Sequence, residues 1–342
     1  MKTPDILRHI AIDDFSATPK YQQLADALLQ AIGEGKIKQN DILPSINELS
    51  YKLDISRDTA EKSLKLLKAR GILGSVPGKG YFVQQTGLRQ QFKILLLFNK
   101  LSEHKKIIYD AFAGKLGDAA SIDFYIYNSD FGLFKKLLQR NLSEYTHVVI
   151  LPHFRERVEV EELLNDIPRE KLILLDKKLK GVTGGYGAVY ENFRENIYEA
   201  LEALRERLEH YQALTLIFPE NTYYPDEIRD GFLQFCQDYA FPARVVHDLT
   251  AGGVRPGEVY INLRESDLVE LIGKTRAQGL TPGKDAGIVS YNETPLKPFI
   301  LNGLTTISTD FQLMGELAAG MILDGALSQV EVPFRVTPRA SL

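Results

Sequence analysis

The sequence predicts an α/β protein in which a small winged helix-turn-helix precedes a larger region built on parallel sheets. Residues 19–83 show the spacing of three helices followed by two short strands, the order of a helix-turn-helix with a two-stranded wing. From residue 92 onward, apolar runs typical of buried strands alternate with helical segments, as in a parallel sheet covered on both faces. Because 342 residues exceed the needs of one ordinary core, we expect an N-terminal domain at 1–86, a linker at 87–92 and a second domain at 93–342.

Each element of the N-terminal domain has a local signal. Apolar residues recur at helical spacing over 21–32 and are followed by two glycines, which typically end a helix. Ser45 and Ser56 are placed as N-caps of two further helices, and Gly71 ends the second of these. We expect the two strands of the wing at 72–75 and 80–83, joined by Val76-Pro77-Gly78-Lys79.

In the second domain the strands are the short apolar runs, and the helices are the amphipathic segments between them. The expected strands are 93–98, 122–127, 147–151, 171–175, 213–218, 243–247, 257–261 and 286–290. The clearest expected helices are 105–119, 131–139, 155–165, 191–208, 226–239, 265–278 and 310–326.

The composition excludes several classes of protein. With 44% hydrophobic and 25% charged residues the chain is typical of a soluble globular protein. A single cysteine, Cys236, cannot form an internal disulfide, which is consistent with a reducing compartment. The aliphatic runs 94–98 and 148–151 are far shorter than the roughly 18 residues of a membrane span. We therefore expect a cytoplasmic protein with no membrane partner.

The charge is unevenly distributed. The whole chain carries a formal net charge of −4, yet residues 35–83 contain nine basic and five acidic side chains. This local excess of positive charge indicates that the segment can face a polyanion.

Residues 19–83 also resemble the DNA-binding domain of the GntR family of bacterial transcription regulators. The motifs are Pro19-Lys20-Tyr21-Gln22-Gln23, Leu43-Pro44-Ser45, Ser56-Arg57-Asp58-Thr59 and Gly78-Lys79-Gly80, in the order typical of that family. The resemblance implies binding to double-stranded operator DNA.

Helical geometry predicts the DNA-reading face. If Ala60, Leu64 and Leu67 face the core, the opposite arc of the helix presents Asp58, Glu61, Lys62 and Lys65, with Arg57 and Thr59 beside it. Arg57 has the geometry to read guanine, whereas Ser45 and Lys79 can contact the DNA backbone.

The contact positions implied by the family resemblance are Asn47, Arg57, Asp58, Thr59, Glu61 and Gly78. Asn47 and Glu61 stand where many relatives have arginine. Glu61 can accept a hydrogen bond from cytosine N4, or it can pair with Arg57 and orient it. Two alternatives remain: the winged helix contacts protein rather than DNA, and the lysines only form a solvated helix face.

The second domain resembles the sugar-sensing domain of the LacI/GalR repressors, which is two-lobed and built like periplasmic binding proteins. The motifs are Gly287-Ile-Val-Ser-Tyr-Asn-Glu-Thr294, Leu304-Thr-Thr-Ile-Ser-Thr-Asp-Phe-Gln-Leu-Met-Gly315 and Pro338-Arg339-Ala340-Ser341. Together with the N-terminal domain, the arrangement is similar to arabinose-type repressors.

In α/β lobes, ligands bind at the carboxyl ends of strands, so polar residues there are the candidates. The resemblance implies Asp176, Asn262, Asn292 and Phe311, and the first lobe adds Ser102 and His104. At the position where the family usually has a ligand-binding arginine, near Gly231, this sequence has Ile228. Arg229 is one residue further along, and Tyr223, Tyr224 or Asp226 can contact the ligand instead. Alternatively, the polar residues are helix caps and Phe311 is a core aromatic.

Several other sequence features do not indicate a catalytic or metal-binding site. Gly181-Val-Thr-Gly-Gly-Tyr-Gly187 lacks the pattern of a phosphate-binding loop and predicts a flexible loop. The six histidines lack metal-ligand spacing, and Cys236 fits a small core residue. We expect no catalytic residue, metal or cofactor.

We therefore predict a homodimeric repressor of a carbohydrate-utilisation operon, controlled by a monosaccharide or an early catabolite. A neutral sugar is preferred because no cluster of basic residues marks the cleft, although Lys100, Lys105, Lys106, Lys177 and Lys178 lie near its strand ends. The alternatives are a sugar-metabolising enzyme on the same scaffold and a DNA-binding or interaction protein without an effector.

Overall fold

The computed structural model describes residues 6–76, 80–84, 92–139, 142–154, 159–220, 222–250 and 252–342. The chain divides into two compact units. Unit 1 comprises Met1–Phe98, Leu116–Asn128 and Gly132–Ile150, and unit 2 comprises Asn99–Lys115, Ser129–Phe131 and Leu151–Leu342. The predicted wing-tip residues Gly78 and Lys79, and the predicted linker up to residue 91, lie outside the described residues.

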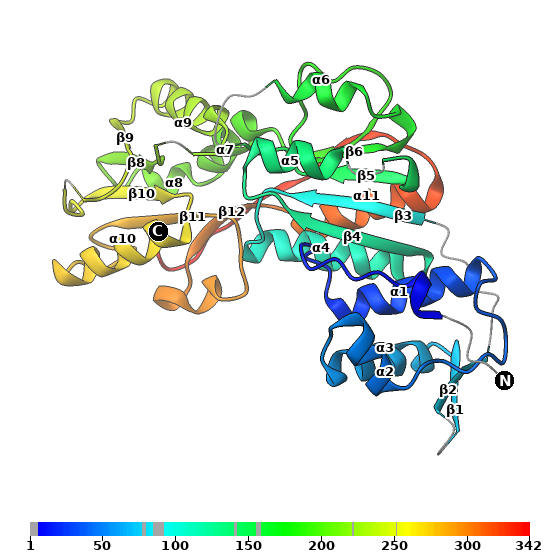
Figure 1. Ribbon diagram of the computed structural model, residues 1–342. Helices are drawn as coiled ribbons and strands as arrows, with labels where there is room; N and C mark the ends of the chain where they lie inside the picture. Colours follow the sequence, from blue (N-terminus) through cyan, green and yellow to red (C-terminus); the bar gives the residue numbers. More distant parts are fainter. Residues whose placement is uncertain are drawn as a thin grey trace. The chain divides into compact units, whose positions relative to one another are not determined.

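The first part of unit 1 is the predicted winged helix-turn-helix, which we call the reader (Figure 1). Its elements are η1 (Ile6–His9), α1 (Lys20–Gly33), α2 (Ile46–Leu53), α3 (Arg57–Ala69), β1 (Leu73–Val76) and β2 (Gly80–Val83). Leu24, Leu28, Leu49 and Leu64 are fully buried in one core that joins the three α-helices. The two strands pair antiparallel, from Leu73 opposite Val83 to Val76 opposite Gly80.

The predicted helix ends are confirmed. Ser45 and Glu48 form a capping box, in which the Ser45 side chain accepts from the Glu48 amide and the Glu48 carboxylate accepts from the Ser45 amide. Ser56 caps α3 through the Thr59 amide, and Gly71 follows α3 with a φ of 72°. Because these hydrogen bonds join residues only three positions apart, the sequence predicts the ends of these helices accurately.

The remainder of unit 1 is a group of parallel strands. It contains β3 (Phe92–Phe98), β4 (Ala120–Ile126) and β5 (His147–Ile150), together with α5 (Phe131–Leu138), η2 (Gly117–Ala119) and η3 (Leu142–Glu144). β3 pairs with β4 on one side and with β5 on the other, so it is central to this group. Residues Ile94–Phe98 are buried, as expected for a strand covered on both faces.

Unit 2 contains a six-stranded sheet with the order β14-β12-β11-β10-β8-β9. Its strands are β8 (Ala213–Ile217), β9 (Ala243–Val246), β10 (Glu258–Asn262), β11 (Gly287–Tyr291), β12 (Thr305–Thr309) and β14 (Phe334–Thr337). They run parallel except β14, which pairs antiparallel with β12. A second parallel group consists of β6 (Leu172–Asp176), β7 (Gly187–Tyr190) and β13 (Gln329–Glu331).

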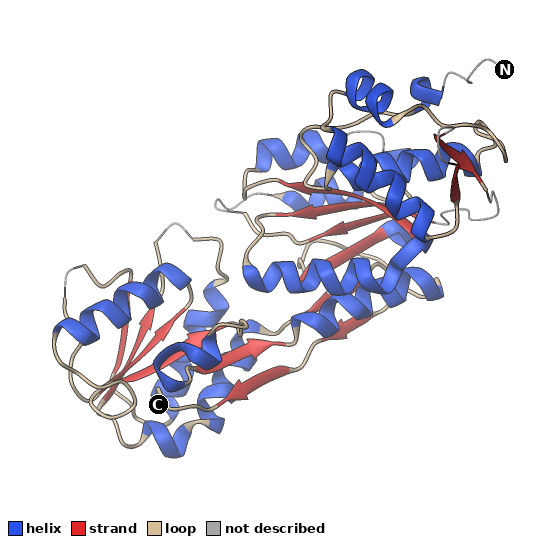
Figure 2. Ribbon diagram, turned by 90° about the horizontal axis from the view of Figure 1, so that it is seen from below, coloured by secondary structure: helices blue, strands red, loops and turns tan. Residues whose placement is uncertain are grey.

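Helices flank these strands (Figure 2). They are α4 (Glu103–Leu116), α6 (Val160–Asn165), α7 (Phe193–Ala203), α8 (Arg205–Leu208), α9 (Asp226–Asp238), α10 (Glu265–Ala277) and α11 (Phe311–Asp324), with η4 (Arg169–Lys171) and η5 (Lys297–Asn302). Among the described residues, no helix is long and apolar enough to cross a bilayer.

Some elements differ from the sequence prediction. The expected helix over 191–208 is divided into α7 and α8 at Leu204. Gly187, which was expected to end a loop, begins β7, and β12, β13 and β14 are absent from the predicted strands. β13 and β14 are only partly buried and lack the continuous apolar run by which the buried strands were recognised.

Two glycines let helices approach closely. A Cβ atom on Gly231 of α9 would lie 2.2 Å from the carbonyl oxygen of Arg194 in α7, and one on Gly315 of α11 would lie 2.4 Å from that of Ile108 in α4. The second contact holds α4 and α11 together near their N-terminal ends, which carry His104 and Phe311.

We predict that Gly231→Ala destabilises the protein by about 1–3 kcal/mol, because a backbone atom blocks the added methyl group. The matched control is Gly273→Ala in α10, where an added Cβ meets nothing within 4 Å. That control is expected to be neutral or to stabilise by up to about 1 kcal/mol. Urea and thermal unfolding of the two variants measure the difference, and equal stabilities would contradict the packing argument.

Candidate functional site

The reader presents polar side chains on α2 and α3. Arg57, Asp58 and Lys62 on α3 are exposed, as is Asn47 on α2. Ala60, Leu64 and Leu67 of α3 are fully buried, so the exposed arc is the one that helical geometry predicted. In the described part of the chain, these side chains therefore face solvent.

Neighbouring contacts restrict several of these side chains. Glu61 forms an ion pair with Lys65 at 2.8 Å rather than the contact with Arg57 that we considered. The Lys62 ammonium lies 3.9 Å from the ring centroid of Tyr21. The Thr59 hydroxyl is 2.8 Å from that of Ser56, at the helix cap. Arg57 at the first turn is therefore the best-placed long cation for reading bases.

Unit 2 contains a small cavity of about 30 Å³ at the ends of β6 and β11. It is lined by His104, Lys105, His153, Asp176, Glu191, Phe193, Tyr223, Tyr224, Pro225, Ile228, Tyr291, Asn292 and Phe311. Five of the eight residues predicted for ligand binding meet here: His104, Asp176, Tyr223, Asn292 and Phe311.

The backbone turns at the two strand ends in the same unusual way. Asp176, the last residue of β6, has a φ of 71°, and Asn292, directly after β11, has a φ of 66°. Asp and Asn adopt this left-handed conformation more readily than most other residues. The buried Lys297 ammonium donates to the carbonyl oxygens of Tyr291 and Asn292, which holds the turn after β11 in place.

A cluster of ionisable groups surrounds Asp176. Its carboxylate is 2.5 Å from Nε2 of His153, whose Nδ1 lies 3.3 Å from the Tyr223 carbonyl oxygen. The Glu191 carboxyl accepts a hydrogen bond from the Thr309 hydroxyl at 2.5 Å. The Lys105 ammonium donates to Asn99. All four ionisable side chains are buried.

Burial sets the protonation of this cluster. Burial and the nearby Asp176 charge raise the pKa of Glu191 well above its usual value, so Glu191 holds a proton. Burial alone would raise the pKa of Asp176 as well, but the hydrogen bond and charge of His153 hold it below the usual range. Burial lowers the pKa of Lys105 to about 7. Burial lowers the pKa of His153 as well, although its hydrogen bond to Asp176 opposes this change. The Asp176 carboxylate thus has a hydrogen-bonded partner in His153 and a nearby ammonium group in Lys105.

The cavity offers both polar and aromatic contacts. Tyr291 Oη and Asn292 Oδ1 are buried and have no hydrogen-bond partner among the residues that the structure describes. The rings of His104 and Phe311 lie 5.0 Å apart, and those of Tyr223 and Tyr224 lie 4.7 Å apart. Such a combination suits a ligand that has hydroxyl groups on an apolar ring face.

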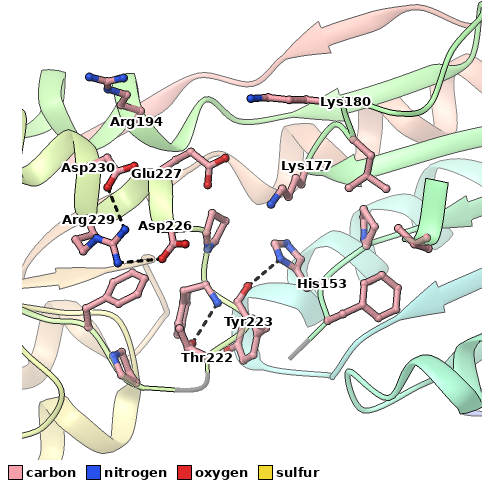
Figure 3. Close-up of a pocket in the computed structure, with 18 of the residues that line it drawn as sticks. His153, Lys177, Lys180, Arg194, Thr222, Tyr223, Asp226, Glu227, Arg229 and Asp230 are labelled. Carbon is pink, nitrogen blue, oxygen red and sulfur yellow. Dashed lines mark hydrogen bonds and ion pairs between the residues drawn. The ribbon is translucent and has the colours of Figure 1, made fainter. Parts of the chain in front are cut away.

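A larger groove of about 1050 Å³ shares His153, Tyr223, Tyr224 and Pro225 with the cavity (Figure 3). Its basic lining residues are Lys177, Lys180, Arg194 and Arg229, and its acidic ones are Glu159, Glu161, Glu220, Asp226, Glu227 and Asp230. Because the acidic side chains outnumber the basic ones, this groove does not favour a phosphorylated ligand.

The other three predicted ligand residues lie apart from the cavity lining. Arg229 lines the groove, where it pairs with Asp226 and Asp230, each at 3.2 Å. Asn262 is buried and donates to the Arg264 carbonyl oxygen. The Ser102 hydroxyl lies 3.2 Å from the His104 ring and can orient it.

The sequence analysis did not predict His153, Glu191, Phe193 or Tyr291 as site residues. It named Lys105 only as one of the lysines that could favour a phosphorylated ligand over a neutral sugar. His153 lies in the loop that follows β5, three residues after the strand ends, and a polar residue in the loop after a buried strand is a usable signal. Glu191 follows β7, a strand that was not predicted. No group of three potential metal ligands occurs in the described part of the chain.

Comparison with known proteins defines the class of the reader first. Residues 20–83 match the family model of the bacterial regulatory proteins of the gntR family. The reader is therefore a GntR-type helix-turn-helix domain.

Individual relatives match the same region. The chain is 38% identical over 66 residues to YydK, an uncharacterized HTH-type transcriptional regulator of Bacillus subtilis, covering 19% of this chain and 28% of that protein. It is 31% identical over 86 residues to the mannosyl-D-glycerate transport/metabolism system repressor MngR of Escherichia coli, covering 25% of this chain and 36% of the relative. It is 32% identical over 73 residues to an arabinose metabolism transcriptional repressor of Geobacillus stearothermophilus, covering 21% and 20%. The alignments thus span about a third or less of these relatives.

The remaining part of the chain resembles solved sugar repressors in fold. The trehalose repressor of Escherichia coli has a TM-score of 0.61 at 13% identity and covers 72% of this chain and all of its own. A dimeric Lac repressor has a TM-score of 0.60 at 16% identity and covers 73% of this chain and 98% of its own. The predicted fold class, a winged helix-turn-helix with a two-lobed α/β domain of the LacI type, is confirmed.

The buried position of Lys105 leads to a prediction about pH. Its pKa is about 7 in the folded protein and 10.5 in the unfolded chain, so the unfolded chain binds the extra proton between these values. The free energy of unfolding of the wild type should therefore rise with pH over this range, relative to Lys105→Met, by up to about 1.4 kcal/mol per pH unit.

Chemical denaturation at a series of pH values measures this effect. The matched control is Lys106→Met, which removes the exposed neighbouring lysine of the same helix. The difference in free energy of unfolding between Lys106→Met and the wild type should not rise with pH over this range. A flat difference for Lys105→Met would contradict the assigned burial of the charge.

Proposed function

We propose that the chain is a transcriptional repressor of carbohydrate-utilisation genes whose operator binding is controlled by a small neutral sugar. The observation that carries this proposal is the presence in one chain of a GntR-type reader and a buried polar and aromatic cavity on a sugar-repressor fold. The relatives named as repressors of mannosyl-D-glycerate and arabinose metabolism support it. The proposal makes the chain a cytoplasmic binding protein rather than an enzyme, and it requires no cofactor.

The reader supports DNA binding through the exposed arc of α3. We propose that this arc enters the major groove, where Arg57 reads a base, while Ser45, Asn47, Asp58, Thr59, Glu61 and Lys62 contribute adjacent contacts. Gly78 and Lys79 belong to the same proposal at the wing tip. A homodimer, with a domain boundary near residues 87–92, would place two readers on a short pseudo-palindrome.

The cavity supports a neutral polyhydroxy ligand. Asp176 and Asn292 offer acceptors, Tyr291 offers a hydroxyl group, and Phe311 offers a ring face. The balanced charges around Asp176 leave no excess of cations to hold a phosphate. Because the cavity holds about 30 Å³, a monosaccharide requires the adjoining groove or a rearrangement of the surrounding side chains.

We predict that Arg57→Ala loses most of its preference for the operator. The loss of one bidentate contact to guanine costs about 1–3 kcal/mol, which corresponds to roughly a 5- to 150-fold weaker binding. Genomic fragments selected by the wild-type protein supply the operator, and gel-shift titration compares it with random DNA. Arg205→Ala, an exposed arginine on α8, is the control. An equal loss on operator and random DNA would refute base reading by Arg57.

We predict that calorimetry with a panel of neutral and phosphorylated sugars finds the tightest binding for a neutral one. Asp176→Asn and Asn292→Ala should weaken that binding by on the order of 10- to 100-fold, because each removes a buried hydrogen-bonding group. Glu199→Gln, an exposed residue on α7, should bind as the wild type does. Unchanged affinity in both cavity variants would contradict the site. A preference for phosphorylated sugars would contradict the ligand class.

A further inference from the structure

The segment of residues 13–18, which precedes the reader's first α-helix, is bound to strand β4. The Ala17 amide donates to the Phe124 carbonyl oxygen at 2.6 Å. The Thr18 hydroxyl donates to the Ile122 carbonyl oxygen at 2.8 Å and accepts from the Phe124 amide at 2.9 Å. In Figure 1 this blue part of the chain runs beside β4. Thr18 is 3% exposed, so these bonds are protected from water.

The bonds occupy the free edge of a sheet. β4 pairs with β3 along its full length and ends the order of strands in its sheet. Alternate residues of an edge strand direct their backbone groups outward, and Ile122 and Phe124 are two such residues. The Ser16 hydroxyl adds a second bond to the Phe124 carbonyl oxygen at 3.0 Å, and the Tyr125 hydroxyl donates to the Asp13 carboxylate at 2.8 Å.

Gln23, a side chain of α1, makes three hydrogen bonds with the same segment. Gln23 of α1 donates to the carbonyl oxygens of Thr18 at 2.7 Å and of Asp13 at 3.1 Å. Its own side-chain oxygen accepts from the Asp13 amide at 2.8 Å. A second contact joins the end of α3 to the residues before β4, where Arg70 pairs with Asp118 at 3.0 Å.

The reader is thus attached to the β3–β4 strand pair of unit 1 twice. One attachment is the covalent connection between β2 and β3, and the other is the hydrogen-bonded 13–18 segment, which lies between η1 and α1. A single connection lets a domain rotate about it, whereas two separated connections restrict that rotation. Strand β3, the partner of β4, leads directly into Asn99, which accepts from the cavity residue Lys105.

We propose that the 13–18 segment docks the reader on the edge of β4 and is the route by which ligand binding changes operator affinity. The docking itself is independent of the proposed function, whereas the coupling rests on it. A change at the end of β3 reaches the reader through β4, the 13–18 segment and Gln23.

The test of docking uses hydrogen exchange on the full-length protein without ligand. In the wild type, the amides of Ala17 and Phe124 should be protected. Thr18→Val keeps the size of the side chain but removes its donor and acceptor, and we expect the Phe124 amide to exchange at least tenfold faster. Asp14→Ala, in the same segment, removes only a surface ion pair with Lys20 and should leave the protection unchanged. Unprotected amides in the wild type would overturn the docking.

The test of coupling uses the operator and the sugar found in the experiments above. Saturating sugar should change the operator affinity of the wild type and of Asp14→Ala equally, and that of Thr18→Val by less than a third as much. The sugar affinity of Thr18→Val should equal that of the wild type, which shows that its cavity is intact. A full ligand response in Thr18→Val would overturn the coupling. If the wild type itself shows no response, the proposed function fails, and hydrogen exchange still decides the docking.

Discussion

The left-handed backbone turns at the ends of β6 and β11 are the constraint on which the candidate site depends. Asp176 and Asn292 adopt φ values of 71° and 66°, and both line the same cavity. A residue with a β-branched side chain at either position would strain the turn. The Lys297 ammonium holds the second turn through two carbonyl oxygens and is itself paired with Glu265 at 3.1 Å. The geometry of the site is therefore set by the backbone before any ligand arrives.

The charges around this turn form one compensated group. A buried carboxylate without a partner is costly; Asp176 has a hydrogen bond with His153 and the nearby Lys105 ammonium, while burial and the Asp176 charge raise the pKa of Glu191. Because these ionisable groups interact electrostatically, replacing one of them changes the pKa values of the others. The same balance argues for a ligand without net charge, since a phosphate would add two negative charges that the cluster does not match.

Hydrogen bonds to backbone groups of β4 hold the 13–18 segment against this strand. The edge of β4 would otherwise present unpaired amides and carbonyl groups, which invite association with other chains. The 13–18 segment covers this edge and connects it to Gln23, a residue of the motif by which the reader resembles its family. One contact can thus both protect an edge strand and orient the domain that carries Arg57.

The sequence by itself determined the elements of the reader and part of the site. Caps such as Ser45 and Ser56 bond to groups three residues away, so a local pattern contains the whole interaction. Asp176 and Asn292 were predicted from the family resemblance together with their places at strand ends, and the structure places both in the lining of one cavity. Only the tertiary structure decided that His153 faces Asp176, 23 residues away, that Glu191 meets Thr309, 118 residues away, and that Thr18 bonds to Ile122, 104 residues away. These pairings depend on how the strands are ordered in their sheets, and no periodicity within a single segment contains that order.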